Sequence, residues 1–139
     1  MSDKLAYCIK GVGGEESCRL QVVADVSCRS AEDVRDIALE GSAYNAVKIR
    51  MDKFPTVSKA LQMCEASREA GWAIVIGCNE NGPETMDTFI ADLAVAVGAG
   101  QFSAGGIAAG EHFCKYSRLL EIAREDPSIR FVGKKFRKP

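Results

Sequence analysis

The sequence predicts an α/β fold in which short parallel strands alternate with helices. Short apolar, β-branched runs recur along the chain, and amphipathic stretches with helix-capping residues lie between them. The 139 residues include 47% hydrophobic and 27% charged side chains, which is enough for one hydrophobic core and excludes a mainly disordered chain. Strands that are joined by crossover helices lie parallel, with right-handed connections.

Four strand–helix units are expected. The strands are predicted over four short apolar runs, at residues 19–26, 46–51, 72–77 and 101–103. Ser30, with the carboxylate of Asp33, is predicted to cap the first helix, which ends near Gly41. Thr56 is predicted to cap the second helix, and Gly71 to end it.

Apolar spacing predicts which faces of the later helices are buried. The second helix has an apolar face formed by Val57, Ala60, Leu61 and Cys64. The next helix has the clearest stripe in the chain, formed by Met86, Phe89, Ile90, Leu93, Ala94 and Val97. The last helix is expected over about residues 110–124, with an inward face of Phe113, Tyr116, Leu119, Leu120 and Ala123.

The four units are expected to form one domain over residues 19–139, after an N-terminal segment 1–18 that could add a strand at residues 5–9. Four units are half of an eight-stranded TIM-type β/α barrel, so the fold predicted is a partial barrel. Half a barrel has two open strand edges, and open edges pair readily with another chain. We therefore expect a partner protein or a second copy of the chain to cover them.

The composition excludes several classes of protein. No apolar run reaches the roughly 20 residues of a membrane helix, and the N-terminus lacks the pattern of a signal peptide, so an intracellular protein without a membrane segment is expected. The six cysteines lie too far apart for a zinc site and are expected to be reduced and mostly buried.

The C-terminal segment from about residue 128 is basic and contains no acidic residue. Its candidate partner-binding residues are Lys134, Lys135, Arg137 and Lys138. Such a cluster is attracted to acidic surfaces, and a protein is favoured over a nucleic acid because the sequence contains no nucleic-acid-binding module. Alternatively, Phe131 and Phe136 pack on the barrel and the lysines are merely solvated.

Six motifs give the chain a family resemblance. In chain order they are VAD at 23–25, NAVKI at 45–49, AGW at 70–72, ETMDTFIADL at 84–93, GQF at 100–102 and KYSRLL at 115–120. With these motifs the chain resembles the C-terminal half of the enolase barrel domain, from about Val22 to Phe136. The resemblance implies the last four strands of that family's barrel.

The resemblance also implies two site residues. In enolases the position of Asp25 is one of three carboxylate ligands of a magnesium ion, and Lys48 fits the position of the general base. The other carboxylates lie on earlier strands, and Mg²⁺ normally needs several oxygen ligands. No cofactor is therefore expected, and magnesium only if the barrel is completed in trans. Both residues are expected to be vestigial, and they could pair with each other across neighbouring strands.

Other positions depart from the enolase pattern. Residues 78–83 stand where the family has a His-Arg-Ser motif that holds the substrate phosphate, and Ser103 replaces a lysine that binds the substrate. His112, the single histidine, is expected to lie on the surface. Since each lost charge-stabilising group typically costs about 10²–10³ in rate, the chain alone is expected not to be an enzyme.

The function expected is therefore a non-catalytic, enolase-like structural module that docks on a partner protein or a larger assembly. One alternative is half of a split enolase-superfamily lyase completed in trans, and another is a regulator that binds authentic enolase. Enolases are cytoplasmic, so the resemblance implies a cytoplasmic location, and a cytoskeletal or ciliary lattice is one assembly that such a module could join.

Overall fold

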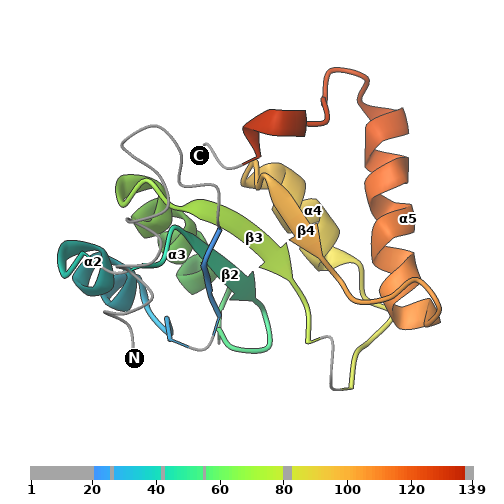
Figure 1. Cartoon of the computed structure of the whole chain (residues 1–139). Helices are drawn as coiled ribbons and strands as arrows, with labels where there is room; N and C mark the ends of the chain where they lie inside the picture. Colours follow the sequence, from blue (N-terminus) through green and yellow to red (C-terminus); the bar gives the residue numbers. More distant parts are fainter. Residues whose placement is uncertain (1–20, 26, 42, 55, 80–82, 137–139) are drawn as a thin grey trace.

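The computed structural model describes residues 21–136 except 26, 42, 55 and 80–82. Four parallel strands form one sheet in the order β1-β2-β3-β4, and helices separate them along the chain (Figure 1). The strands are β1 (Val23–Ala24), β2 (Ala46–Arg50), β3 (Ala73–Gly77) and β4 (Gln101–Ser103). The helices are α2 (Ala31–Leu39), α3 (Val57–Glu69), α4 (Phe89–Ala96), α5 (Gly110–Glu125) and the 3-10 turn η1 (Gly133–Lys135). This arrangement confirms the predicted partial barrel.

The two faces of the sheet differ because successive side chains of a strand point to opposite sides. One face packs against the helices and supplies the core residues Ala24, Val47, Ile49, Ile74 and Ile76. The other face, which we call the concave face, carries the alternate residues, including Lys48, Val75 and Gln101, which stand at one level of the sheet. The concave face corresponds to the interior of a complete barrel.

The predicted helix caps are confirmed. The N–H of Asp33 donates to Ser30 Oγ at 3.1 Å, and the N–H of Ser30 donates to Asp33 Oδ2 at 3.0 Å, which completes a capping box. Thr56 Oγ1 accepts the N–H of Lys59 at the start of α3. Gly71 follows α3 with a φ of 71°, a left-handed conformation that glycine adopts without strain.

Two predicted buried faces are wrong in part. Helix α4 begins at Phe89 rather than near Met86, because the Asp87 carboxylate accepts the N–H of Phe89 and holds the preceding residues in a turn. Met86 is accordingly 65% exposed. On α3, Ala60 and Cys64 are buried as predicted, but Val57 and Leu61 lie at the edge of the face and are exposed.

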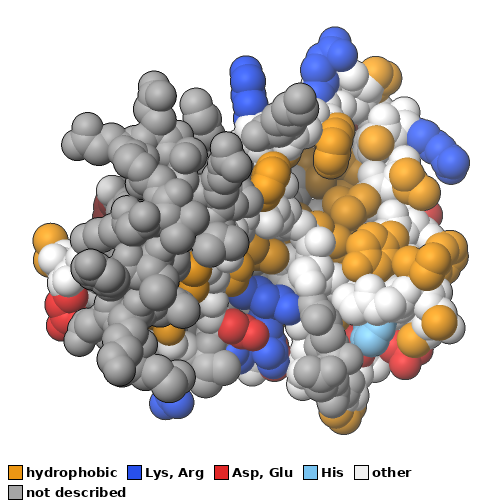
Figure 2. All heavy atoms as spheres, viewed as in Figure 1, with side chains coloured by type: hydrophobic (Ala, Val, Ile, Leu, Met, Phe, Trp, Pro, Cys, Tyr) orange, Lys and Arg blue, Asp and Glu red, His pale blue; other side chains and the backbone are white. Residues whose placement is uncertain are grey.

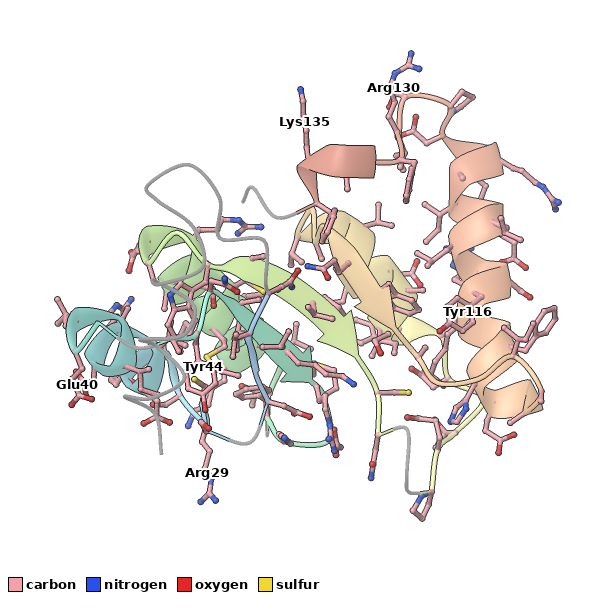
Figure 3. The ribbon with its side chains drawn as sticks, in the orientation of Figure 1. Arg29, Glu40, Tyr44, Tyr116, Arg130 and Lys135 are labelled. Atoms are coloured by element: carbon pink, nitrogen blue, oxygen red, sulfur yellow. The ribbon has the colours of Figure 1, made fainter. Side chains whose placement is uncertain are left out.

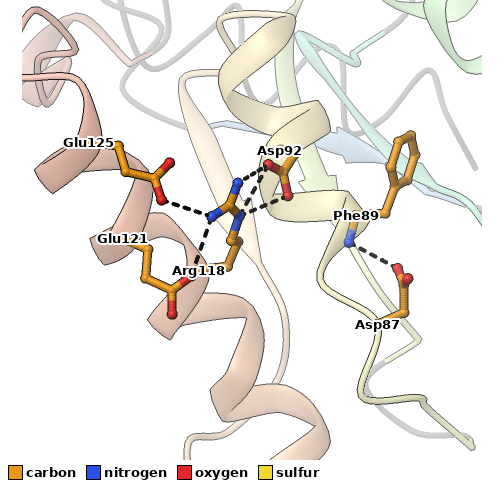
Figure 4. A network of polar contacts seen from close by, with 6 residues as sticks. All are labelled: Asp87, Phe89, Asp92, Arg118, Glu121 and Glu125. Carbon is orange, nitrogen blue, oxygen red and sulfur yellow. Dashed lines mark hydrogen bonds and ion pairs between the residues drawn. The ribbon is translucent and has the colours of Figure 1, made fainter.

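Helix α5 lies beyond β4 and is fastened to α4 by a charged network (Figure 4). The Arg118 guanidinium donates to both carboxylate oxygens of Asp92 on α4, with Nη2 2.8 Å from Oδ1, and also donates to Glu121 and Glu125. The hydrogen bonds from Arg118 hold the pKa of the Asp92 carboxyl below its usual range. These contacts fix α5 against α4.

The inward face predicted for α5 is largely wrong. Phe113 is 53% exposed and Leu120 is 60% exposed, whereas Lys115 and Ile122 are buried. Among the described elements, α5 packs against α4 and reaches the sheet through Tyr116, whose ring meets that of Phe102 edge-on at 5.6 Å. No described strand packs against the other residues of the face predicted for α5.

The C-terminal segment also differs from one prediction. Phe131 is 95% exposed, so it does not pack on the barrel, whereas Phe136 is partly buried with its main chain against Gly100. The extra strand suggested for residues 5–9 lies outside the described residues. In the part of the chain that the structure describes, no helix is long and apolar enough to span a membrane.

Candidate functional site

The carboxyl ends of β1, β2 and β3 meet along one rim of the sheet. Asp25 follows β1, Arg50 ends β2 and Cys78 follows β3. In β/α barrels this rim carries the active site, because parallel strands bring the loops that follow them together there. We therefore take this rim as the candidate functional site.

Asp25 is held by two cations. Lys53 Nζ lies 2.6 Å from Asp25 Oδ1 and 3.0 Å from the Asp25 main-chain oxygen, and an Arg50 guanidinium nitrogen lies 3.7 Å from Oδ2. The chain turns directly after β2, since the N–H of Lys53 donates to the Arg50 carbonyl, and this turn brings Lys53 back toward β1. The position that the resemblance assigns to a metal ligand thus lies inside a cluster of salt bridges.

Lys48 does not pair with Asp25, which corrects that expectation. Its side chain passes over Gly77 on the concave face, where a Cβ on Gly77 would come within 2.5 Å of Lys48 Cε. Lys48 stands two residues before the end of β2 and extends across β3, on the side of β2 opposite to β1. The cations that contact the Asp25 carboxylate are therefore Lys53 and Arg50, whereas the Lys48 side chain extends over Gly77.

Arg50 and Asp52 form the second part of the cluster. Arg50 Nε donates to Asp52 Oδ1 at 3.0 Å, and this side-chain hydrogen bond raises the pKa of Arg50 and lowers the pKa of Asp52. An arginine does not lose its proton in proteins, so Arg50 cannot act as a general base. The Arg50 guanidinium is therefore a permanent positive charge at the end of β2, next to Asp25.

A cavity of about 360 Å³ opens between this rim and the loop before α4, lined in part by Asp52, Cys78, Glu84 and Lys115. Lys115 comes from α5 and is 2% exposed. Its amine donates to the carbonyls of Thr85 at 2.7 Å and Glu111 at 2.6 Å. Lys115 therefore ties the loop before α4 to α5.

Glu84 supplies the charge that accompanies Lys115. Its carboxylate lies 3.5 Å from the Lys115 amine and accepts the N–H of Thr85 at 2.9 Å. Burial alone would raise the pKa of Glu84, but the Thr85 N–H, the Lys115 charge and a hydrogen bond from Cys78 together hold that pKa below its usual value. Glu84 is thus an anion engaged by its own neighbours.

The donor set at the rim does not fit a magnesium ion. Within the described residues, no three His, Cys, Asp or Glu side chains come together in a way that could hold a metal ion. The carboxylate of Asp25 has cationic neighbours in Lys53 and Arg50, and Mg²⁺ would have to displace them.

His112 lies in the first turn of α5 and is partly buried, because its ring packs against Gly105, so the expected surface histidine is in part covered. Ser103 ends β4 beside the path of Lys48, where its carbonyl would meet a Cβ on Gly77. Neither residue adds a carboxylate to the rim.

Of the basic C-terminal residues, those that the structure describes lie away from the rim. Arg130 and Lys135 are exposed and point outward from the segment after α5 (Figure 3). Lys134 lies in η1, and Arg137 and Lys138 lie outside the described residues. A hollow of about 340 Å³ lies beside this segment, lined mostly by apolar residues that include Phe102, Leu119, Phe131 and Val132.

The sequence reasoning missed the charged residues that surround Asp25 and Glu84. The sequence did point to three of them, because Arg50, Asp52 and Lys53 are charged residues clustered at the end of a predicted strand. Lys115 carried no such signal, because a lysine in an amphipathic helix is usually solvated. Its burial depends on the loop that α5 meets.

Comparisons with known proteins agree with this fold. A family profile described as "Enolase, C-terminal TIM barrel domain" matches residues 9–139. The chain is 38% identical over 104 residues to a protein described as Enolase 1 from Methylococcus capsulatus, in an alignment that covers 75% of this chain and 24% of that protein. The chain thus spans about a quarter of the length of this curated relative. The chain belongs to the family of enolase C-terminal TIM barrel domains.

Proposed function

We propose that the chain is a non-catalytic, enolase-related module that docks on a partner protein or a larger assembly. The observation that carries the proposal is the environment of Asp25, whose carboxylate is bound by Lys53 at 2.6 Å and faced by Arg50 at 3.7 Å. An active metal centre needs a carboxylate that is available to the ion. Here that carboxylate stabilises the turn after β2 instead.

The charges around the cavity support the same conclusion. An acidic substrate entering it would meet the carboxylates of Asp52, Glu84 and Asp87. Lys115, the lysine that the described residues place in its wall, already donates to Thr85 and Glu111. These three carboxylates would repel such an anion. The cavity therefore suits a structural role better than the binding of a phosphorylated acid.

The surface supports docking. Apolar side chains gather over α5 and the C-terminal segment in Figure 2. On these two segments Phe113, Leu120 and Phe131 are each more than half exposed. A small protein seldom exposes a large contiguous apolar patch unless a partner covers it. The basic residues Lys134, Lys135, Arg137 and Lys138 follow in sequence and would add attraction to an acidic partner surface.

A second candidate function is half of a split enolase-superfamily lyase. It is favoured by the chain's match to 24% of Enolase 1 and by the positions of Asp25 and Lys48 at the rim and on the concave face. In that case another polypeptide would supply the remaining carboxylates and magnesium would bind in trans. A regulator that binds authentic enolase is a variant of the docking proposal with a specified partner.

Affinity capture of the tagged full chain from its native cells tests these proposals. The recovered complex is sized and assayed for magnesium-dependent dehydration of 2-phosphoglycerate. A complex without turnover, unchanged in yield by Lys48→Ala, is expected for a docking module. Turnover that Lys48→Ala abolishes, and that Lys59→Ala on the exposed face of α3 leaves intact, would establish the split enzyme instead. The same capture identifies the cellular assembly, including any cytoskeletal or ciliary one, to which a cytoplasmic module would belong.

A further inference from the structure

Each central helix of the fold covers two strands. Helix α3 packs on β2 and β3, and α4 packs on β3 and β4. If this pattern continues by one strand for each helix, α5 should pack on β4 and on the strand that follows β4. Among the described elements no such strand exists, and the apolar side chains Phe113 and Leu120 of α5 remain exposed above its place.

We propose that a second copy of this chain supplies that strand. Strand β1 of the second copy pairs in parallel with β4 of the first, the reverse contact forms on the other side, and the two half barrels close one ring. This inference rests on the proposed docking function and specifies its partner. Two sets of four strands give the eight that a closed β/α barrel contains.

The strand register predicts how the two copies meet. A path drawn at right angles to the strands runs from Val23 through Ala46 and Ala73 and continues to the level of Ala99. In a closed barrel of this type such a path returns displaced by about eight residues, which is about four for each identical half. Val23 of the second copy then lies opposite either Val95 or Ser103 of the first. Val95 lies in α4, so Ser103 is the partner.

The directions of the main-chain groups agree with this register. The Ser103 carbonyl accepts the N–H of Cys78, so the main-chain groups of Ser103 face β3 and those of Phe102 face outward. On β1, Val22 is bonded to Asn45, so the groups of Val23 face outward. With Val23 of one copy opposite Ser103 of the other, the N–H of Val23 meets the carbonyl of Phe102, as in a parallel ladder. The N–H of Ala104 is already donated to the Tyr116 hydroxyl, so the pairing ends at Ser103.

Sedimentation equilibrium of the full chain tests the proposal, with circular dichroism to verify folding. The wild type should sediment at twice the mass of the 15.0 kDa chain. Val23→Pro removes the N–H that the ring uses and should weaken the dimer by at least about tenfold, because the contact occurs twice. Val23→Thr keeps the N–H and should remain dimeric.

A second pair of variants keeps the test valid if Val23→Pro fails to fold. Leu120→Glu lies on the exposed stripe of α5 and should give a folded monomer, whereas Leu61→Glu on the outer side of α3 should stay dimeric. A wild type that is monomeric at the highest soluble concentration would overturn the second copy as the partner. It would point to residues 1–20 or to another protein as the cover of these edges.

The two proposals fail in different ways. A monomer that is recovered with another protein and shows no turnover would overturn the dimer and leave the docking function in place. A dimer that ignores both Val23→Pro and Leu120→Glu would place the interface elsewhere and overturn the register. Magnesium-dependent turnover by any recovered complex would overturn the docking function itself.

Discussion

At the scale of single residues, Lys115 should be the charged group that matters most to stability. It is 2% exposed, and its three partners are the carbonyls of Thr85 and Glu111 and the carboxylate of Glu84. Lys115→Met should lower the free energy of unfolding by about 2–4 kcal/mol, because it leaves buried acceptors and a carboxylate without their donor.

Urea unfolding measures this loss. The matched control is Lys59→Met, since Lys59 is an exposed lysine on α3 and should change the free energy of unfolding by less than about 0.5 kcal/mol. Equal effects of the two substitutions would show that the Lys115 amine does not hold the loop before α4.

Two carboxylates that line the cavity, Asp52 and Glu84, predict how stability depends on pH. The pKa values of Glu84 and Asp52 lie below their ordinary values of 4.5 and 3.8 in the folded protein, because nearby donors bind the ionised forms. A lowered pKa means that the unfolded chain binds protons more readily. The two groups therefore stabilise the fold fully above about pH 5 and lose that contribution as the pH falls through the folded pKa values.

Urea midpoints at neutral pH and near pH 3 test this expectation, with Glu84→Gln as the comparison. The wild type should lose stability over this range, and the variant should lose less because position 84 no longer titrates. An identical pH dependence in both proteins would show that titration of Glu84 does not contribute to the pH dependence of stability.

The sequence allowed Asp25 to be chosen as a candidate but not its neighbours to be identified. Lys48 was the expected partner because its strand lies next to that of Asp25. The Lys48 side chain extends over Gly77, toward β3, whereas the turn after Arg50 returns Lys53 to Asp25. Which cation reaches a carboxylate depends on a few ångströms of loop geometry, and periodicity contains no information about that.

At the scale of elements, the start of α2 depends on Ser30. Ser30→Ala removes the acceptor for the Asp33 N–H and should lower the free energy of unfolding by about 1 kcal/mol. Ser58→Ala is the control, since Ser58 is exposed within α3 and is not its N-cap. A loss no larger than that of the control, measured by urea unfolding, would contradict the role of the capping box.

Tyr116 joins α5 to the end of β4. Its hydroxyl accepts the N–H of Ala104 at 3.2 Å and donates to the carbonyl of Gly105 at 2.9 Å. Tyr116→Phe keeps the ring contact with Phe102 and should cost about 1–2 kcal/mol of unfolding free energy.

Hydrogen exchange distinguishes this local role from a general weakening. The Ala104 amide should exchange faster in Tyr116→Phe than in the wild type, relative to the central amides of β3. Uniform acceleration across the sheet would mean that the hydroxyl does not protect this edge.

The order and kind of the four described strands and of helices α2 to α5 followed from periodicity and capping residues, whereas their boundaries and the short helix η1 did not. The strand expected over 19–26 is described only at Val23–Ala24, and the stripe that included Met86 begins one turn later. The Asp87 carboxylate accepts the N–H of Phe89 and so competes with a helical turn before α4, and apolar spacing carries no information about this local effect.

At the scale of the whole molecule, the thiols report on global unfolding. Cys28, Cys64 and Cys78 are buried, and burial raises the pKa of the Cys64 thiol to about 11. Cys114 is partly exposed on α5. Alkylation near pH 8 should therefore modify Cys114 in the native protein, and Cys28 and Cys64 only at the rate of global unfolding.

Peptide mapping after pulses of iodoacetamide measures these rates residue by residue. The rate for Cys64 should rise with urea in parallel with the loss of helical signal. Modification of Cys64 as fast as Cys114 in the absence of urea would contradict a single cooperative core.

The partial barrel was predictable because each strand–helix unit has its own local pattern of apolar and capping residues. The parallel order of the strands follows from the helices that connect them. What covers the outer elements was not predictable. The apolar spacing in α5 predicts that Phe113 and Leu120 lie on a face that is covered. It does not predict whether the covering surface belongs to the same polypeptide, and in the single chain both residues are exposed. Burial is a property of the assembled molecule, whereas periodicity belongs to the segment.

Gly77 imposes a lasting restriction on how this protein can diverge. A side chain at this position would meet Lys48 Cε at 2.5 Å and the Ser103 carbonyl at 2.6 Å, and the carbonyl belongs to the strand pairing and cannot move aside cheaply. Lineages descending from this sequence could exchange many exposed residues, but a replacement at 77 would require simultaneous change in two neighbouring strands. The path of one lysine across the sheet thereby narrows the mutational routes open to its neighbours.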